Sequence, residues 1–129
     1  MQFSGKKAEY LIGLAQLFDD GLMSKNKLPS LPDFPSRQKA LTDIRGIGIW
    51  TANYALMKSL KETSSIPHGD AGLLNALKAH RIIEQKTDTE PISDLFNSFS
   101  GWESYLVFYL WRSLAPTENE KLRSYIDSI

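Results

Sequence analysis

A Gly-x-Gly turn between two helical segments constrains the fold more than any other feature of the sequence. The turn, Arg45-Gly46-Ile47-Gly48, separates a short segment at 36–43 from a longer one at 49–60. Glycine permits backbone angles that other residues rarely adopt and lets another molecule approach closely. Unpaired N–H groups and the positive dipole end at the start of the second helix favour an anion such as a DNA phosphate. The alternative interpretation is an αα-corner in which glycine only allows tight packing.

Helical spacing of apolar residues also marks the N-terminal part of the chain. From Ser4 to Asp20 apolar residues recur three and four positions apart, and Gly21 is placed to end that helix. Three prolines within 21–35 predict a loop. Ser36 is the predicted N-cap of the short helix at 36–43.

The C-terminal half shows the same helical character. Helices are expected at 71–81, 91–99 and 102–114. The last of these is apolar nearly all round and is predicted to be a buried central helix. Thr117 and Glu120 form a capping box that predicts a final helix. No stretch alternates as a strand does, so the predicted fold class is all-α, a helical bundle formed by one domain of 129 residues.

The composition excludes several kinds of site. Fifteen Lys and Arg balance fifteen Asp and Glu, so any contact with DNA has to come from local geometry rather than from bulk positive charge. The chain has no cysteine, which excludes thiolate zinc sites and an iron–sulfur cluster held by cysteines. No apolar run has membrane-spanning length and no signal peptide is visible, so we expect no membrane association and a cytoplasmic location, at the nucleoid if the source is bacterial.

Residues 44–54, Ile-Arg-Gly-Ile-Gly-Ile-Trp-Thr-Ala-Asn-Tyr, resemble a hairpin found in one family of repair enzymes. The resemblance is to the helix-hairpin-helix (HhH-GPD) DNA glycosylase superfamily, and within it to the 3-methyladenine DNA glycosylase II type. The superfamily is marked by the hairpin, a Gly/Pro-rich loop and an aspartate. Here the loop is Ile66-Pro67-His68-Gly69, and Asp70 follows 22 positions after Gly48. All three marks are therefore present in order.

The resemblance extends over nearly the whole chain. Residues 5–12 resemble the helix before the hairpin, and 102–111 resemble the tryptophan-containing helix near the family's C-terminus. It implies that residues 1–129 form the C-terminal portion of such a glycosylase domain. The hairpin then occupies about 36–60, and the loop with its aspartate occupies 61–70.

The resemblance further implies a monofunctional N-glycosylase of base-excision repair. Members with lyase activity carry a nucleophilic lysine two positions after the second hairpin glycine, where this chain has Trp50, and an indole cannot form a Schiff base. The implied reaction removes alkylated purines such as 3-methyladenine from double-stranded DNA by base flipping and aspartate-assisted attack of water. The residues implied to contact DNA phosphates are Gly46, Ile47, Gly48 and Thr51.

Asp70 is the candidate catalytic residue. Cleavage of an N-glycosidic bond leaves positive charge on the sugar, and a nearby carboxylate stabilises that charge and can orient or deprotonate water. An aspartate directly before a helix is also an ordinary N-cap. The two roles are compatible.

Three aromatic residues correspond to the family's base pocket: Trp50, Tyr54 and Trp111. Aromatic faces attract cations, and an alkylated purine often carries positive charge. The alternative interpretation is core packing, the usual role of aromatic side chains at helical spacing. Trp102 and Tyr105 are assigned to packing.

The resemblance also implies a bound monovalent cation, K⁺ or Na⁺, at the hairpin. The matching ligands are the backbone carbonyls of Thr42, Ile44 and Ile47. No other cofactor is expected.

Nothing in the sequence matches the helical bundle that precedes the hairpin region in the family, and Glu103 stands where relatives commonly have a basic residue. Three explanations of this missing match are that the chain is a fragment, a split gene product or a degenerate protein.

The alternative function is a non-catalytic helix-hairpin-helix module that binds DNA or a protein. We expect the isolated chain to show little or no activity and to self-associate, because absent helices would leave apolar surfaces uncovered. These surfaces are the first helix, at Leu11, Ile12, Ala15 and Phe18, and the helix carrying Trp111.

Overall fold

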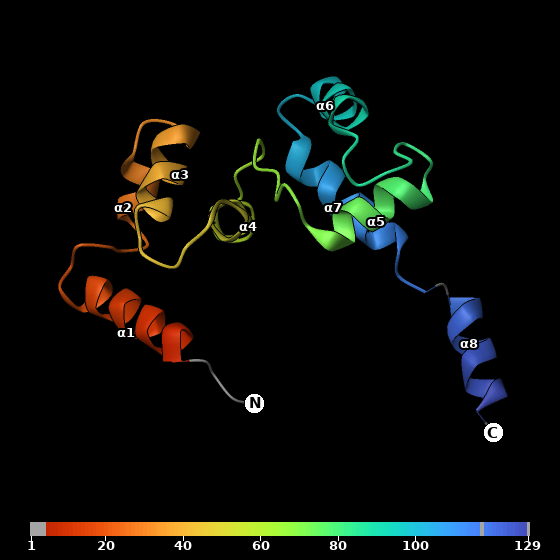
Figure 1. Cartoon of the computed structure of the whole chain (residues 1–129), viewed down its shortest axis with the longest axis horizontal. Coiled ribbons are helices and arrows are strands. Elements are labelled where there is room, and N and C mark those ends of the chain that lie inside the picture. Colours follow the sequence, from red (N-terminus) through yellow and green to blue (C-terminus); the bar gives the residue numbers. More distant parts are fainter. Residues whose placement is uncertain (1–4, 117, 129) are drawn as a thin grey trace. The chain divides into compact units, whose positions relative to one another are not determined.

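The computed structural model describes residues 5–116 and 118–128, and over these residues the chain is all helical, with eight helices and no strand. This confirms the predicted fold class. The helices, shown in Figure 1, are α1 (Gly5–Asp19), α2 (Lys27–Ser30), α3 (Phe34–Thr42), α4 (Ile49–Ser59), α5 (Ala71–Ala79), α6 (Thr89–Ser98), α7 (Glu103–Ser113) and α8 (Glu118–Asp127). Thr117, one half of the predicted capping box, lies outside the described residues.

The chain divides into two compact units, Met1–His68 and Gly69–Ile129. The first unit contains α1 to α4 and the second contains α5 to α8. The boundary falls in the loop directly before Asp70, so the predicted hairpin and the predicted catalytic residue lie in different units.

In the first unit, α3 packs against α4 around an apolar cluster. Its buried members are Met23, Leu41, Ile44, Ala52 and Leu56. In contrast to α3 and α4, α1 buries none of its fifteen residues.

The prediction of a loop over residues 21–35 is partly wrong, and the prediction that Ser36 is the N-cap of the next helix is wrong. The segment contains the one-turn helix α2, and α3 begins at Phe34 with Asp33 as its N-cap. The backbone N–H of Ser36 donates to Asp33 Oδ1 over 2.8 Å, so Ser36 lies inside the first turn. Proline suits the first turn of a helix because its missing N–H would have no partner there. The prolines therefore mark a helix start as well as a loop.

In the second unit, α5 packs against α7, but α7 is not the buried central helix predicted from its composition. Only Ser104, Val107 and Leu110 are buried, all on one side of the helix. Tyr109 is 75% exposed on another side. The prediction counted tyrosine as apolar, whereas a tyrosine can place its ring on the surface with its hydroxyl in water.

None of the described helices has the length and hydropathy needed to cross a bilayer.

Candidate functional site

The turn between α3 and α4 has the form that the sequence predicts. Asp43 caps the end of α3, and α4 begins after Gly48. Within the turn the N–H of Ile47 donates to the carbonyl of Ile44 over 3.0 Å. No side chain caps the start of α4, and the first intrahelical donor is Ala52 N, which bonds to Gly48 O. The start of α4 therefore has no side-chain cap, and the N–H of Thr51 precedes the first intrahelical donor.

The two glycines of the turn have different structural roles. Gly46 has φ +92°, and a Cβ there would lie 2.4 Å from Cγ of Tyr10 in α1. Gly48 has φ −86°, and a Cβ there would meet no atom within 4 Å. Gly46 is thus required by the fold itself, whereas Gly48 leaves the start of α4 uncovered. The sequence pattern alone does not show that Gly46 and Gly48 have different structural roles.

Arg45 connects the turn to α1. Its guanidinium lies 5.7 Å from the centre of the Tyr10 ring and forms a 2.8 Å ion pair with Glu9. Both partners precede the turn by more than thirty positions, and neither was singled out from the sequence.

Trp50 and Tyr54, one helical turn apart on α4, stack with ring centres 5.2 Å apart and planes inclined by 22°. Their exposed fractions are 40% and 37%, so they are not core residues. The core-packing alternative is therefore wrong for this pair. Lys58 Nζ lies 5.9 Å from the Tyr54 ring centre, which shows that this aromatic surface accommodates a cation.

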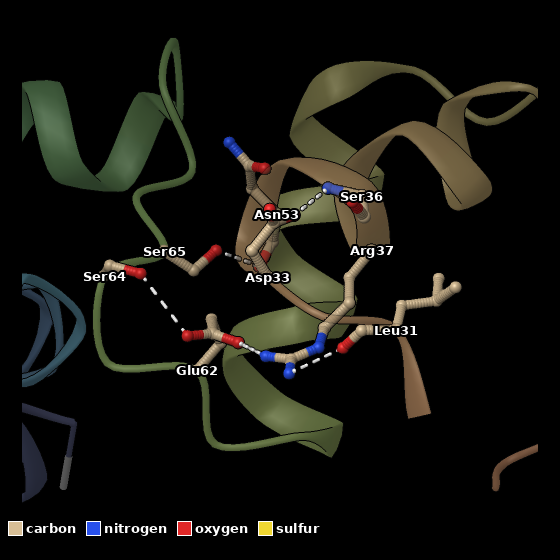
Figure 2. A network of polar contacts seen from close by, with 8 residues as sticks. All are labelled: Leu31, Asp33, Ser36, Arg37, Asn53, Glu62, Ser64 and Ser65. Carbon is tan, nitrogen blue, oxygen red and sulfur yellow. Dashed lines mark hydrogen bonds and ion pairs between the residues drawn. The ribbon is translucent and has the colours of Figure 1, made fainter. Parts of the chain in front are cut away.

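The loop from Leu60 to His68, which leads from α4 toward Asp70, is bound to α3 and α4 by polar contacts (Figure 2). Arg37 Nη1 forms a 2.6 Å ion pair with Glu62 Oε2, and Arg37 Nη2 donates to the carbonyl of Leu31 over 3.0 Å. Ser65 Oγ donates to the carbonyl of Asn53 over 2.8 Å. The loop is therefore anchored at two points visible in this view.

Asp70, the second residue of the second unit, is the N-cap of α5. Its Oδ2 accepts a 2.8 Å hydrogen bond from the backbone N–H of Leu73 and a 2.9 Å hydrogen bond from Nε1 of Trp111. The predicted capping role is confirmed. The structure also brings together two residues that the sequence assigned to the site separately, 41 positions apart.

Gly72 makes the contact between Asp70 and Trp111 possible. A Cβ at this position would lie 3.1 Å from Asp70 Oδ2 and 3.3 Å from Trp111 Nε1. Gly72 was not predicted as a site residue, although a glycine in the first turn of a helix, where it weakens the helix, indicates that a structural reason keeps it there.

Trp111 packs edge-on against Phe108, with ring centres 5.9 Å apart. The assignment of Trp102 and Tyr105 to core packing is wrong, because they are 62% and 48% exposed. The centres of these two rings lie 5.3 Å apart, on the side of α7 that does not face the core. The site residues thus form two pairs, Trp50 with Tyr54 in the first unit and Asp70 with Trp111 in the second.

Over the described part of the chain, no group of three or more His, Cys, Asp or Glu side chains could hold a metal ion. The predicted cation ligands are different in kind, being the carbonyls of Thr42, Ile44 and Ile47. They lie at the end of α3 and in the turn, and the Ile44 carbonyl already accepts one hydrogen bond from Ile47 N. A carbonyl has two lone pairs, so one remains for a ligand. Uncharged oxygen donors fit a monovalent cation.

No family model matches the chain, and no solved structure matches it. Two curated proteins of Bacillus subtilis (strain 168) are similar to it. The protein named "DNA-3-methyladenine glycosylase" is 41% identical over 109 residues, which cover 84% of this chain and 36% of the relative. The protein named "Putative DNA-3-methyladenine glycosylase YfjP" is 39% identical over 118 residues, which cover 88% of this chain and 39% of that relative. The chain thus spans less than two fifths of the length of these relatives.

Proposed function

We propose that this chain carries the hairpin and catalytic aspartate of a helix-hairpin-helix DNA glycosylase that removes alkylated purines such as 3-methyladenine. The contact between Asp70 and Trp111, 2.9 Å from carboxylate to indole, is the observation that carries the proposal. It joins a carboxylate to an aromatic ring in a chain similar over 84% and 88% of its length to proteins named DNA-3-methyladenine glycosylase. The proposed place of action is the bacterial cytoplasm, at the nucleoid.

In the proposed reaction Asp70 acts on the sugar. The bond between C1′ and the base nitrogen breaks, and its electron pair leaves with the base, which neutralises the cationic alkylated purine. The carboxylate stabilises the positive charge left on the sugar. Water then adds to C1′ and gives its proton to Asp70. Two hydrogen-bond donors on Oδ2, Leu73 N and Trp111 Nε1, hold the carboxylate in one orientation.

The rings proposed to receive the flipped base are Trp50 and Tyr54 in the first unit, and the family resemblance adds Trp111 of the second unit. An electron-rich ring face attracts a cationic purine, and such a base leaves readily without an acid catalyst. The stacked and half-exposed rings of Trp50 and Tyr54 support this role, because buried core rings could not accept a ligand.

The proposed DNA-backbone contact is the start of α4. Gly48 leaves it uncovered, and the N–H of Thr51 precedes the first intrahelical donor. Gly46 and Ile47 shape the turn. A K⁺ or Na⁺ bound by the carbonyls of Thr42, Ile44 and Ile47 would supply positive charge beside the phosphate. With equal numbers of basic and acidic residues, such local donors have to provide the attraction to double-stranded DNA.

A non-catalytic DNA-binding module is the second candidate, and it is favoured by the start of α4, which no side chain caps and which could bind DNA phosphate without a catalytic residue. Leu11, Ile12 and Phe18 of α1 are each at least half exposed. A groove of about 1000 Å³ runs between α1 and the end of α3. We propose that further helices of a complete glycosylase cover these surfaces, and that the isolated chain self-associates through them.

The experiment is a base-release assay on alkylated duplex DNA with the chain alone and with the unmatched part of the Bacillus subtilis relative added as a separate chain. We expect little release by the chain alone and release of 3-methyladenine after addition. Light scattering should show a multimer of the chain alone. DNA binding without release under either condition would select the non-catalytic candidate, and a monomer that excises bases unaided would refute the need for further helices.

A further inference from the structure

Asn53 is the most deeply buried polar side chain of α4, with 2% of its surface exposed. Its Oδ1 accepts a 2.6 Å hydrogen bond from Nε2 of Gln38 in α3. Its Nδ2 donates to the carbonyl of Ile66 over 2.7 Å. The side-chain amide is thus engaged both as acceptor and as donor, which is what a buried amide requires.

The same residue binds the loop a second time through its backbone. Ser65, which is fully buried, donates its hydroxyl to the carbonyl of Asn53 over 2.8 Å (Figure 2). Two consecutive loop residues, Ser65 and Ile66, are therefore fastened to one residue of α4. Pro67, whose side chain is also fully buried, restricts the backbone directly after them.

This double contact shortens the free connection between α4 and Asp70. Without it, the connection would run over the eight positions from Glu62, which Arg37 and the carbonyl of Leu56 also hold, to Asp70. With it, only the four positions from Ile66 to Asp70 are free. The corresponding extended lengths are roughly 28 Å and roughly 14 Å.

We propose that Asn53 is a positioning residue for the reaction: by fixing Ser65 and Ile66 to α4, it restricts the region that Asp70 can explore. This inference rests on the proposed function of Asp70. Because effective concentration falls with about the −3/2 power of tether length, loss of both contacts is expected to slow base release by about 3-fold. A rigid loop would make the loss larger.

The test uses Asn53→Asp, which keeps the acceptor for Gln38 and removes the donor to Ile66. Gln38→Ala is the matched control, because it breaks the other side-chain bond of Asn53 and leaves the loop bond. Hydrogen exchange of the whole chain is the first readout, since Ser65 N and His68 N donate within the loop. We expect exchange of these amides to rise about 10-fold in Asn53→Asp with α3 and α4 unchanged, and to stay unchanged in Gln38→Ala.

Exchange that rises equally throughout the first unit, or a loop that stays protected, would overturn the inference. If Asn53→Asp does not fold, Ser65→Ala removes one of the two contacts and is expected to raise loop exchange by a smaller factor. Single-turnover base release by the active form is the second readout. Positioning predicts a lower rate constant with full amplitude and unchanged DNA affinity, whereas simple destabilisation lowers the amplitude. If the wild type releases no base even after the unmatched part of the relative is added, the proposed function fails, and the exchange data alone decide whether Asn53 holds the loop.

Discussion

Each unit of the chain contains a polar side chain that forms two hydrogen bonds, Asn53 in the first unit and Asp70 in the second, but these side chains differ in charge and in their hydrogen-bond partners. Asn53 in the first unit has a neutral amide that donates to a carbonyl and accepts from another amide. Asp70 in the second unit has a carboxylate that only accepts, from a backbone N–H and an indole. The first arrangement holds backbone segments together. The second holds a negative charge beside an aromatic ring.

Under the proposed function, we expect the two units to tolerate different changes. Changes to the turn and loop of the first unit should cause instability or weaker DNA binding. Loss of the negative charge of Asp70 in the second unit should lower the rate of base release.

Of all the substitutions, Asp70→Asn should most clearly distinguish a loss of base release from a loss of stability or DNA binding. Asparagine caps helices as well as aspartate does, so α5 and the folded state should be retained. Removal of the negative charge should lower base release by at least about 100-fold. The rate of 3-methyladenine release by the active form and the affinity for DNA are the measurements. Release at the wild-type rate would remove Asp70 from the mechanism, while loss of DNA binding would show that the residue acts on the fold.

Substitutions of the two glycines test the first unit. Gly46→Ala should destabilise the chain by about 2–4 kcal/mol, because alanine is strained at positive φ and its Cβ would overlap Tyr10. Gly48→Ala should change stability by less than about 0.5 kcal/mol. Urea unfolding measures both. Equal effects of the two substitutions would mean that the contact with Tyr10 does not form.

A bulkier residue at the open position should affect DNA rather than stability. Gly48→Leu should weaken binding to duplex DNA of any sequence, because the start of α4 is proposed to contact phosphate and not bases. The wild-type affinity should fall as salt rises, with a modest slope because few phosphates are engaged. Fluorescence anisotropy at several salt concentrations is the measurement. An affinity that is independent of salt would contradict phosphate binding.

Trp111→Phe should slow base release by about 10-fold. The phenyl ring keeps an aromatic face but has no N–H to donate to Asp70, and a hydrogen bond to a charged group contributes about 1.5–3 kcal/mol. Trp50→Phe is the comparison, because it makes the same change of ring in the first unit and keeps a ring to stack on Tyr54. Equal rate losses in both variants would indicate that ring size, and not the hydrogen bond, determines the rate.

The smallest expected effect concerns Asp33, an exposed cap remote from the proposed chemistry. Hydrogen bonds from the hydroxyl and the backbone N–H of Ser36 hold the pKa of Asp33 below its ordinary value. A lowered folded-state pKa means that this carboxylate stabilises the fold above its unfolded-state pKa of about 3.9 and loses that contribution as pH falls through the folded value. Asp33→Asn keeps a cap and should lose only this pH dependence. Urea unfolding between about pH 6 and pH 3 should show the difference at the acidic end. Parallel curves for the two proteins would contradict the assignment.

The helices and the turn could be predicted because periodicity, glycine and proline act locally. The start of α3 was misplaced because prolines occur both in loops and in first turns, and the pattern does not distinguish these. Exposure was harder to predict. The rings of Trp102 and Tyr105 count as apolar in any pattern, but which side of α7 meets α5 depends on packing between segments distant in sequence.

For the proposed site as well, single residues could be predicted, but contacts between distant segments could not. Asp70 and Trp111 could each be assigned from resemblance, but their hydrogen bond could not, because no rule of spacing relates residues of different helices. Asn53 was missed altogether. A single asparagine on a helix resembles a surface residue in sequence, and only the positions of Gln38 and Ile66 show why it is buried.

The sequence separation of these contacts has a consequence for the order of folding. The bond from Asn53 to Ile66 closes a loop of 13 positions, whereas the bond from Trp111 to Asp70 closes one of 41. Short loops cost less entropy to close and form sooner, and chains fold from the N-terminus as they leave the ribosome. The contact of Asn53 with the loop can therefore be complete while α7 is still being synthesised. The carboxylate of Asp70 meets the indole of Trp111 later, so a nascent chain would hold the proposed DNA-binding turn in place before the proposed catalytic group is oriented.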